Sequence, residues 1–209
     1  MKKILMLLVA FCLMVPAVDA ISSKELEKLR KKELNEKKKE FKKQGRELLG
    51  SSRSLEVMLA THYAKLDELG ESGQEVSGVA TKVKSKNVGR QMAYSNACLS
   101  YAQQANGQLK ARMVGDVSAN AANTDAEMDS FYSAYERHVE KEMNGELKES
   151  FCTIRTNPDG TYEIESFCIV NEDAASKARV RAFENAMKES QAAQKHAQSI
   201  SDFVNERVE

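Results

Sequence analysis

Four basic residues lie close together in the sequence, where a short stretch of alternating apolar and polar residues is followed by a long helical pattern. They are Lys82, Lys84, Lys86 and Arg90. The three lysines have the same parity, so a regular strand would point them to one face. Arg90 lies one turn into the expected helix, whose first backbone amides have no intrahelical acceptor. Cations beside a helix N-terminus favour an anion, so this spacing predicts an anion site that takes lipopolysaccharide or a glycan phosphate.

The same lysines have a second interpretation, which assigns them no ligand. Lysine side chains along the outer edge of a strand discourage that edge from pairing with another sheet. A charged outer face of a scaffold is therefore the alternative to a binding site, and the residue pattern is compatible with both.

Residue types that support catalysis or metal binding are present, but no recognised motif brings them together. His62, His138 and His196 each lack a second histidine at helical spacing, and neither HExxH nor CxxC occurs. No serine or cysteine has a histidine and an acid placed by a known catalytic motif. We therefore expect a protein that is not an enzyme and that uses no metal or cofactor. An enzyme of unrecognised type is the remote alternative.

The first twenty residues, MKKILMLLVAFCLMVPAVDA, have the pattern of a secretory signal peptide. Lys2 and Lys3 precede an apolar stretch that is shorter than the ~20 residues of a membrane-spanning helix. Cys12 follows the bulky Phe11, where a lipoprotein signal requires a small residue, so lipidation is not expected. The pattern predicts a mature chain that begins near Ile21 and is exported to the periplasm or the outer membrane.

Residues 21–47 form a basic segment. It contains eleven Lys or Arg and six Asp or Glu, a net charge of +5, whereas residues 48–209 carry a net charge of −6. Ser22 and Glu25 are spaced as a capping box, and Glu and Lys alternate at helical intervals. We expect a solvated helical arm that contacts the domain, a second copy or the surface of a membrane. The six acids and the export signal argue against nucleic acid as a partner.

Residues 48–209 predict a single α+β domain, in which a small antiparallel sheet of one strand plus a hairpin packs with several long helices. Amphipathic spacing predicts helices, and a Val79-to-Val83 alternation predicts the strand. The expected helices run from Ser54 to Gly70, from about Asn87, from a capping box at Thr124 and Glu127, and, rich in alanine, from Asn171 onward.

Two patterns indicate buried surfaces. Alanines recur at helical spacing in two of the expected helices, which suits close packing. In the hairpin, the even-numbered positions form the drier face, and the odd-numbered face is polar apart from Phe151 and Phe167. The alanines are Ala93, Ala97, Ala102 and Ala105 in one helix, and Ala175, Ala178, Ala182, Ala186, Ala193 and Ala197 in the other.

The hairpin contains two of the three cysteines that follow the signal. Its NPDG turn sets a register in which Cys152 faces Ser166 and Cys168 faces Ser150. The two sulfurs are then diagonal neighbours, ~7 to 8 Å apart, which is beyond disulfide geometry. We expect buried free thiols, although a register shift would bring the two cysteines opposite each other.

The stretches GVATKVKSKNVGRQMAYSNACLSYAQQ and ESFCTIRTNPDGTYEIESFCIVN also carry a resemblance. Residues 75–170 resemble the small bacterial envelope lipoproteins typified by the twenty-kilodalton membrane lipoprotein of Helicobacter, and the whole chain resembles uncharacterised secreted proteins of Bacteroidales. The resemblance implies a non-enzymatic α+β envelope protein, with some relatives in surface or flagellum-associated assemblies. This chain lacks a lipoprotein cysteine after its signal. The combined prediction is an exported structural or interaction module whose partners are envelope proteins or a second copy.

Overall fold

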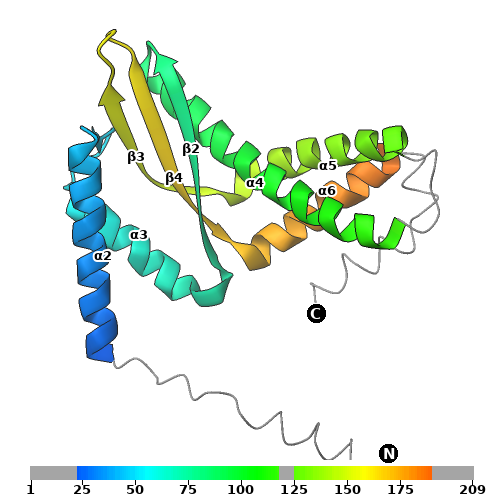
Figure 1. The fold of residues 1–209 in the computed structure, drawn as a ribbon, viewed down its shortest axis with the longest axis horizontal. Coiled ribbons are helices and arrows are strands. Elements are labelled where there is room, and N and C mark those ends of the chain that lie inside the picture. The colour runs from blue at the N-terminus through cyan, green and yellow to red at the C-terminus, as the bar shows by residue number, and fades with distance from the viewer. Residues whose placement is uncertain (1–22, 118–124, 190–209) are drawn as a thin grey trace, which may run out of the picture. The chain divides into compact units, whose positions relative to one another are not determined.

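The computed structural model describes residues 23–117 and 125–189, and every structural statement below concerns these residues (Figure 1). The predicted signal peptide, the capping residues Ser22 and Thr124, and the last helix beyond Glu189 lie outside them. The chain divides into two compact units, residues 1–37 and 38–209. The division falls at Lys37, within the basic helix, rather than at the predicted boundary after Glu47.

The predicted α+β class is confirmed, and the sheet has four strands instead of three. The added strand is the two-residue β1, whose short length leaves no periodic signal. The elements, in chain order, are α2 (Ser23–Lys43), β1 (Glu47–Leu48), α3 (Leu55–Leu69), a 3-10 turn η1 (Gly70–Ser72), β2 (Gly73–Val83), α4 (Lys86–Val117), α5 (Asp125–Glu146), β3 (Lys148–Thr156), β4 (Tyr162–Asn171) and α6 (Glu172–Glu189).

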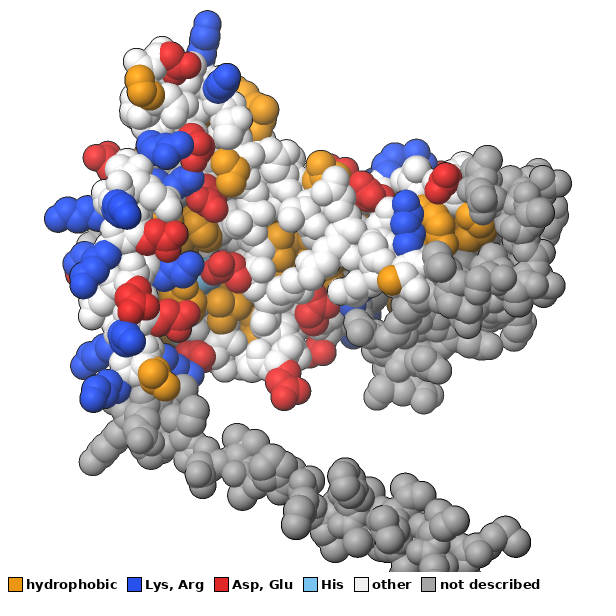
Figure 2. Space-filling model, in the orientation of Figure 1, with side chains coloured by type: hydrophobic (Ala, Val, Ile, Leu, Met, Phe, Trp, Pro, Cys, Tyr) orange, Lys and Arg blue, Asp and Glu red, His pale blue; other side chains and the backbone are white. Residues whose placement is uncertain are grey.

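Helix α2 contains the predicted basic arm. Lys and Arg side chains are interspersed with Glu along it (Figure 2). Lys32 Nζ lies 3.9 Å from Glu36 Oε1 at the expected i, i+4 spacing. Within the smaller unit, the apolar side chain of Leu29 is 53% exposed.

The caps of α3 match their sequence signals. Ser54 accepts a hydrogen bond from the backbone N–H of Val57, and Gly70 ends the helix with a φ of 56°. A serine at the N-cap satisfies an amide that has no partner inside the helix. A glycine adopts the left-handed backbone at the C-terminus without strain from a Cβ.

The sheet is antiparallel in the order β1-β3-β4-β2. The turn forms as predicted, with the N–H of Asn157 donating to the carbonyl oxygen of Thr161 at 2.8 Å, and Cys152 lies opposite Ser166. Cys168, however, faces Glu149 and not Ser150. A register shift between Glu149 and Phe151 causes this difference, because the extra residue of a bulge moves the following positions along by one.

One face of the sheet is covered by α4, which packs against β2 and β4 (Figure 1). Ala93 and Ala97 are fully buried in this contact, as the alanine spacing predicts. Gly78 of β2 lies directly beneath them, because a Cβ there would overlap the backbone of both alanines. The small residues therefore let helix and strand approach at backbone distance.

Helices α4, α5 and α6 pack together next to the sheet and extend the core beyond it (Figure 1). On α5, Phe131, Val139 and Met143 are fully buried. Phe183 of α6 meets the ring of Phe131 edge-on at 5.6 Å. The predicted α6 alanines, which are Ala175, Ala178, Ala182 and Ala186, are all buried in this contact.

The opposite face of the sheet carries the aromatic pair. Phe151 and Phe167 stack with ring centroids 4.5 Å apart and an angle of 10° between their planes. Phe41, at the end of α2, meets both rings edge-on. Fully buried His62 of α3 also meets Phe151 edge-on. Phe41 of the predicted arm thus belongs to the core of the domain.

Candidate functional site

The four basic residues of the predicted anion site surround the connection between β2 and α4. The strand is not regular here, because its register with β4 shifts between Ala80 and Val83, and Lys82 has a left-handed φ of 54°. The prediction that the three lysines share one face required regular alternation along the strand, and the bulge interrupts that alternation. Lys84 lies beyond β2, and Lys86 is the first residue of α4.

Two of the four side chains contact other side chains of the protein. Arg90 donates from Nε to Oε1 of Glu149 at 2.9 Å, and this hydrogen bond raises the pKa of the guanidinium. Glu149 also accepts a hydrogen bond from Ser166 at 2.8 Å. The ammonium of Lys86 lies 5.2 Å from the ring centroid of Tyr162, a cation–π distance. Arg90 and Lys86 are therefore partly committed to internal contacts.

The first turn of α4 is also capped from within the chain. Ser85 Oγ accepts the backbone N–H of Val88 at 3.4 Å, so the expectation of a free amide at that position is wrong. Lys82 and Lys84 remain exposed. Hydrogen bonds from Thr161 lower the pKa of the Asp159 carboxyl, and the charge of Lys82 lowers it to a smaller extent. The cationic part of the site is thus concentrated on Lys82 and Lys84.

Apolar side chains are exposed beside these lysines. Val88 and Met92 are 51% and 45% exposed, and Val79 of β2 is 38% exposed. The Asn96 side chain, one turn beyond Met92, donates to the carbonyl oxygen of Val79 at 2.7 Å. This side of α4 therefore runs beside the edge strand. The Val79 side chain points to the other face of the sheet, because it alternates with Gly78, which faces α4. We call the surface that consists of Lys82, Lys84, Lys86, Val88 and Met92 the β2–α4 corner.

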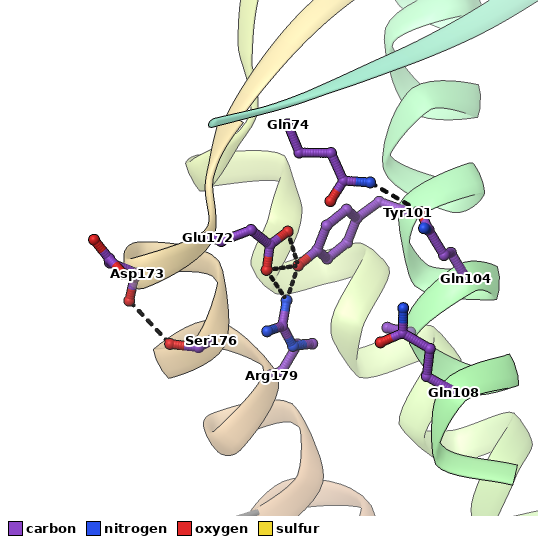
Figure 3. Close-up of a pocket in the computed structure, with 9 residues that line it drawn as sticks. Gln74, Tyr101, Gln104, Gln108, Glu172, Asp173, Ser176 and Arg179 are labelled. Atoms are coloured by element: carbon purple, nitrogen blue, oxygen red, sulfur yellow. Dashed lines mark hydrogen bonds and ion pairs between the residues drawn. The ribbon is translucent and has the colours of Figure 1, made fainter. Parts of the chain in front are cut away.

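A pocket of about 350 Å3 lies where α4, the start of α6 and the start of β2 meet. Tyr101, Gln104 and Gln108 lie on one face of α4 because they are three and four residues apart. Gln74 enters from β2, and its amide N–H donates to Oε1 of Gln104 at 3.1 Å. Figure 3 shows these side chains facing those of α6 across the pocket.

Tyr101, Glu172 and Arg179 form a hydrogen-bonded cluster in the pocket wall. The Tyr101 hydroxyl donates to the Glu172 carboxylate, with oxygen distances of 3.0 and 3.2 Å. Arg179 Nη1 donates to Oε2 of Glu172 at 2.7 Å and also to the Tyr101 hydroxyl. The guanidinium lies 5.7 Å from the Tyr101 ring centroid, and that tyrosine is 3% exposed. These hydrogen bonds therefore hold the three side chains in one arrangement at the side of the pocket.

The α6 side of the pocket adds a carboxylate and a hydroxyl. Asp173 Oδ2 accepts a hydrogen bond from Ser72 at 3.1 Å. Ser176 donates to the backbone carbonyl oxygen of Asp173 at 3.0 Å. Asn171 caps the helix by accepting the N–H of Asp173 at 2.9 Å, which fixes the position of both side chains.

The three cysteines are free and buried, as predicted. Burial raises the pKa of the Cys98 thiol to about 11, that of Cys152 to about 12 and that of Cys168 to about 11. A thiol must ionise before it acts as a nucleophile. These thiols therefore serve as small core side chains at neutral pH.

The two histidines in the described residues are each paired with a carboxylate. His62 Nε2 lies 2.5 Å from Glu75, and His138 Nε2 lies 2.8 Å from Glu189; His196 lies outside the described residues. Within residues 23–117 and 125–189, no three His, Cys, Asp or Glu side chains form a set of metal ligands. No helix in these same residues is both long and apolar enough to cross a membrane.

Comparison of the chain with protein-family models, with curated proteins and with solved structures finds no match. The resemblance to envelope lipoproteins therefore stays a prediction. The pocket leaves no signal in the sequence, because Tyr101 lies 71 residues before Glu172. Helical spacing predicts that Gln104 lies beside Gln108 on α4, and that Glu172 and Arg179 share a face of α6. It does not predict that these two helices face each other.

Proposed function

We propose that the chain is an exported, non-enzymatic protein of the cell envelope that acts as a structural or interaction module. The observation that carries this proposal is the β2–α4 corner, where Val88 and Met92 are about half exposed. Large apolar side chains that gather at one place on a surface are typical of contact sites. The apolar residues and the neighbouring lysines together favour a partner with both apolar and acidic groups.

The packing of the rest of the domain supports the same proposal. The alanine faces of α4 and α6 are covered by the sheet and by neighbouring helices. In the pocket, both oxygens of Glu172 accept hydrogen bonds, and Arg179 pairs with this carboxylate. A carboxylate with these contacts is better suited to a structural role, in which it links the side chains of the pocket, than to proton exchange with a substrate.

A site-specific photocrosslinker tests the proposal in cells. Substitution of Met92 by p-benzoylphenylalanine should give crosslinked adducts in the exported fraction. Val57 on α3 is 46% exposed, close to the 45% of Met92, and is the matched control that should give none. Equal adducts from both positions, or none from Met92, would contradict an interaction surface at the corner. The mass of the adduct separates a second copy from another envelope protein.

Export has its own test, because the signal peptide is a prediction from sequence. Fractionation of cells that express the full chain should place a processed protein, which begins near Ile21, outside the cytoplasm. Recovery of unprocessed protein in the cytoplasm alone would contradict export. The same fractions show whether the basic arm holds the protein at a membrane surface, since high salt should then release it.

The second candidate function is the binding of an anionic envelope ligand, either lipopolysaccharide or a glycan phosphate. The exposure of Lys82 and Lys84 favours it, because these ammonium groups can approach a phosphate without breaking an internal ion pair. Arg90 is a weaker candidate, since it would have to exchange Glu149 for the ligand.

A further inference from the structure

The pocket between α4 and α6 differs from the β2–α4 corner in shape and in chemistry. The corner is a surface on the first turns of α4, whereas the pocket is concave and lies further along that helix (Figure 3). Its volume of about 350 Å3 falls at the lower end of the ~300–1,000 Å3 of small-molecule sites. The pocket is therefore large enough for a small molecule.

Side-chain amides supply most of the hydrogen-bonding groups on one side of the pocket. The bond from Gln74 to Gln104 uses one N–H and one carbonyl oxygen, which leaves the oxygen of Gln74 and the N–H groups of Gln104. Gln108, one turn later, makes no hydrogen bond within the described residues. Donors and acceptors thus alternate along this wall.

The opposite side adds acceptors that are held in place. Asp173 uses Oδ2 for Ser72, so its Oδ1 can accept from a ligand. Ser176 donates its hydroxyl hydrogen to the helix backbone, which leaves the lone pairs of its oxygen as acceptors. A ligand that lies between the two walls can therefore donate to the α6 side, and it can both donate to and accept from the glutamine amides of the other side.

The charge of the lining excludes strongly anionic ligands. The guanidinium of Arg179 is balanced by the carboxylate of Glu172 at 2.7 Å. Asp173 is the remaining formal charge among the lining side chains. An added phosphate or carboxylate would be repelled by Asp173, whereas an apolar ligand would leave the amides without partners. The lining suits a neutral molecule rich in hydroxyl groups.

We propose that this pocket binds a neutral saccharide through the side chains of Gln104, Gln108 and Asp173. Each sugar hydroxyl donates one hydrogen bond and accepts others, which matches a wall of amides facing a carboxylate. The hydrogen-bonded cluster of buried Tyr101 with half-buried Glu172 and Arg179 holds the two helices in position, so little ordering is required when the sugar binds. This inference is independent of the interaction surface proposed at the β2–α4 corner.

The test is a titration of the mature chain with maltose and with N,N′-diacetylchitobiose, followed by NMR of the glutamine side-chain amides. At least one disaccharide should shift the Gln104 and Gln108 amide signals. Gln108→Ala should weaken that binding by about ten-fold, which corresponds to the loss of one or two hydrogen bonds. Gln103 is exposed on the same helix but does not line the pocket. Gln103→Ala should leave the affinity unchanged.

Three results would overturn the proposal. The first is that neither disaccharide shifts the amides at millimolar concentration. The second is that glucose 1-phosphate binds more tightly than both, which would indicate an anion site. The third is that Gln103→Ala weakens binding as much as Gln108→Ala. Gln108 is exposed, so Gln108→Ala should fold, and an unchanged thermal midpoint would show that it does. Asp173→Asn is a second variant that tests the opposite side of the pocket. Asp173→Asn keeps an acceptor and should retain measurable binding.

Discussion

Gly78 of β2 lies against the backbone of Ala97 of α4 so closely that a Cβ on the glycine would overlap the amide nitrogen of the alanine. The carbonyl oxygen of Ala93 blocks the same position. Both obstacles are backbone atoms and cannot move like the end of a flexible side chain. This contact fixes the distance between α4 and the sheet, and α4 carries residues of both the corner and the pocket.

The first prediction is that Gly78→Ala lowers the free energy of unfolding by about 3 kcal/mol, because α4 must move away from β2. Urea unfolding followed by circular dichroism measures this change. Gly107, within α4, has no neighbouring atom within 4 Å of the position that a Cβ would take, so Gly107→Ala is the control. It should stabilise the protein by about 0.5 to 1 kcal/mol, because alanine is the better helix former. Equal effects of the two substitutions would contradict the close contact.

The second prediction concerns Arg46, which follows α2 and lies against the sheet. Its side chain is 8% exposed and pairs with Glu163 and, at 3.1 Å, with Glu165. Arg46→Ala should lower the free energy of unfolding by about 3 kcal/mol, because partly buried Glu165 loses this cation and Glu163 keeps only its ion pair with Arg155. The same unfolding measurement checks it.

Arg137 provides the control for Arg46, because it also pairs with a glutamate but its side chain is 65% exposed. Arg137→Ala should change the free energy of unfolding by less than about 0.5 kcal/mol. A loss at Arg46 as small as that at Arg137 would mean that the ion pairs do not hold residues 38–48 to the domain.

The third prediction is a loss of stability at alkaline pH that depends on the cysteines. Burial raises the folded-state pKa of Cys98 and Cys168 to about 11 and that of Cys152 to about 12, from an ordinary value of 9.0. Above pH 9 the unfolded chain ionises its thiols while the folded chain retains the protons. The stability that is present below pH 9 should therefore fall progressively up to about pH 12.

The alkaline effect is measured as unfolding free energy against pH for the natural chain and for a triple Cys→Ala variant. The variant starts from a lower stability because it loses buried sulfur atoms, but its decline above pH 9 should be shallower. Tyr94, whose pKa burial raises to about 12, is present in both proteins, but Cys98 and Cys168 also raise its pKa, so a part of the difference comes from this tyrosine. Parallel declines would exclude the thiols as the cause. A thiol reagent should modify the three cysteines only after unfolding.

Much of the fold is predictable from the sequence because its signals are local. Ser54 and Gly70 mark the ends of α3, and the NPDG turn sets the start of the hairpin register. The alanine spacing identifies the buried sides of α4 and α6. The predicted pair of Phe151 and Phe167 stacks on the other face of the sheet. Each of these features depends on residues close in the chain or on a simple period.

The features that escaped prediction depend on contacts between distant residues. Arg46 is buried by Glu163, which lies 117 positions later, and an arginine in a basic segment gives no sign of burial. The register shift beside Glu149 moves Cys168 away from Ser150. The bulge at Lys82 separates the three lysines that parity had placed together. The period of a strand is informative only while the strand stays regular.

The last prediction separates the exposed lysines from Arg90. If the corner binds an anionic envelope ligand, Lys82→Gln with Lys84→Gln should weaken lipopolysaccharide binding by more than about ten-fold, because each ammonium makes a charge-assisted contact. Thermal stability should stay within about 0.5 kcal/mol, since both side chains are exposed.

Arg90→Gln should give the opposite pattern. It removes the partner of Glu149, so it should lower stability while binding falls less than in the lysine variant. Titrations of lipopolysaccharide and of a phosphorylated glycan fragment, each at two salt concentrations, distinguish the two ligands and the ionic contribution. Unchanged binding in the lysine variant, or no binding by the natural chain, would identify the lysines as the charged edge of a scaffold. That edge has a physical role of its own, because exposed lysines and a bulge at the end of β2 prevent another strand from pairing there.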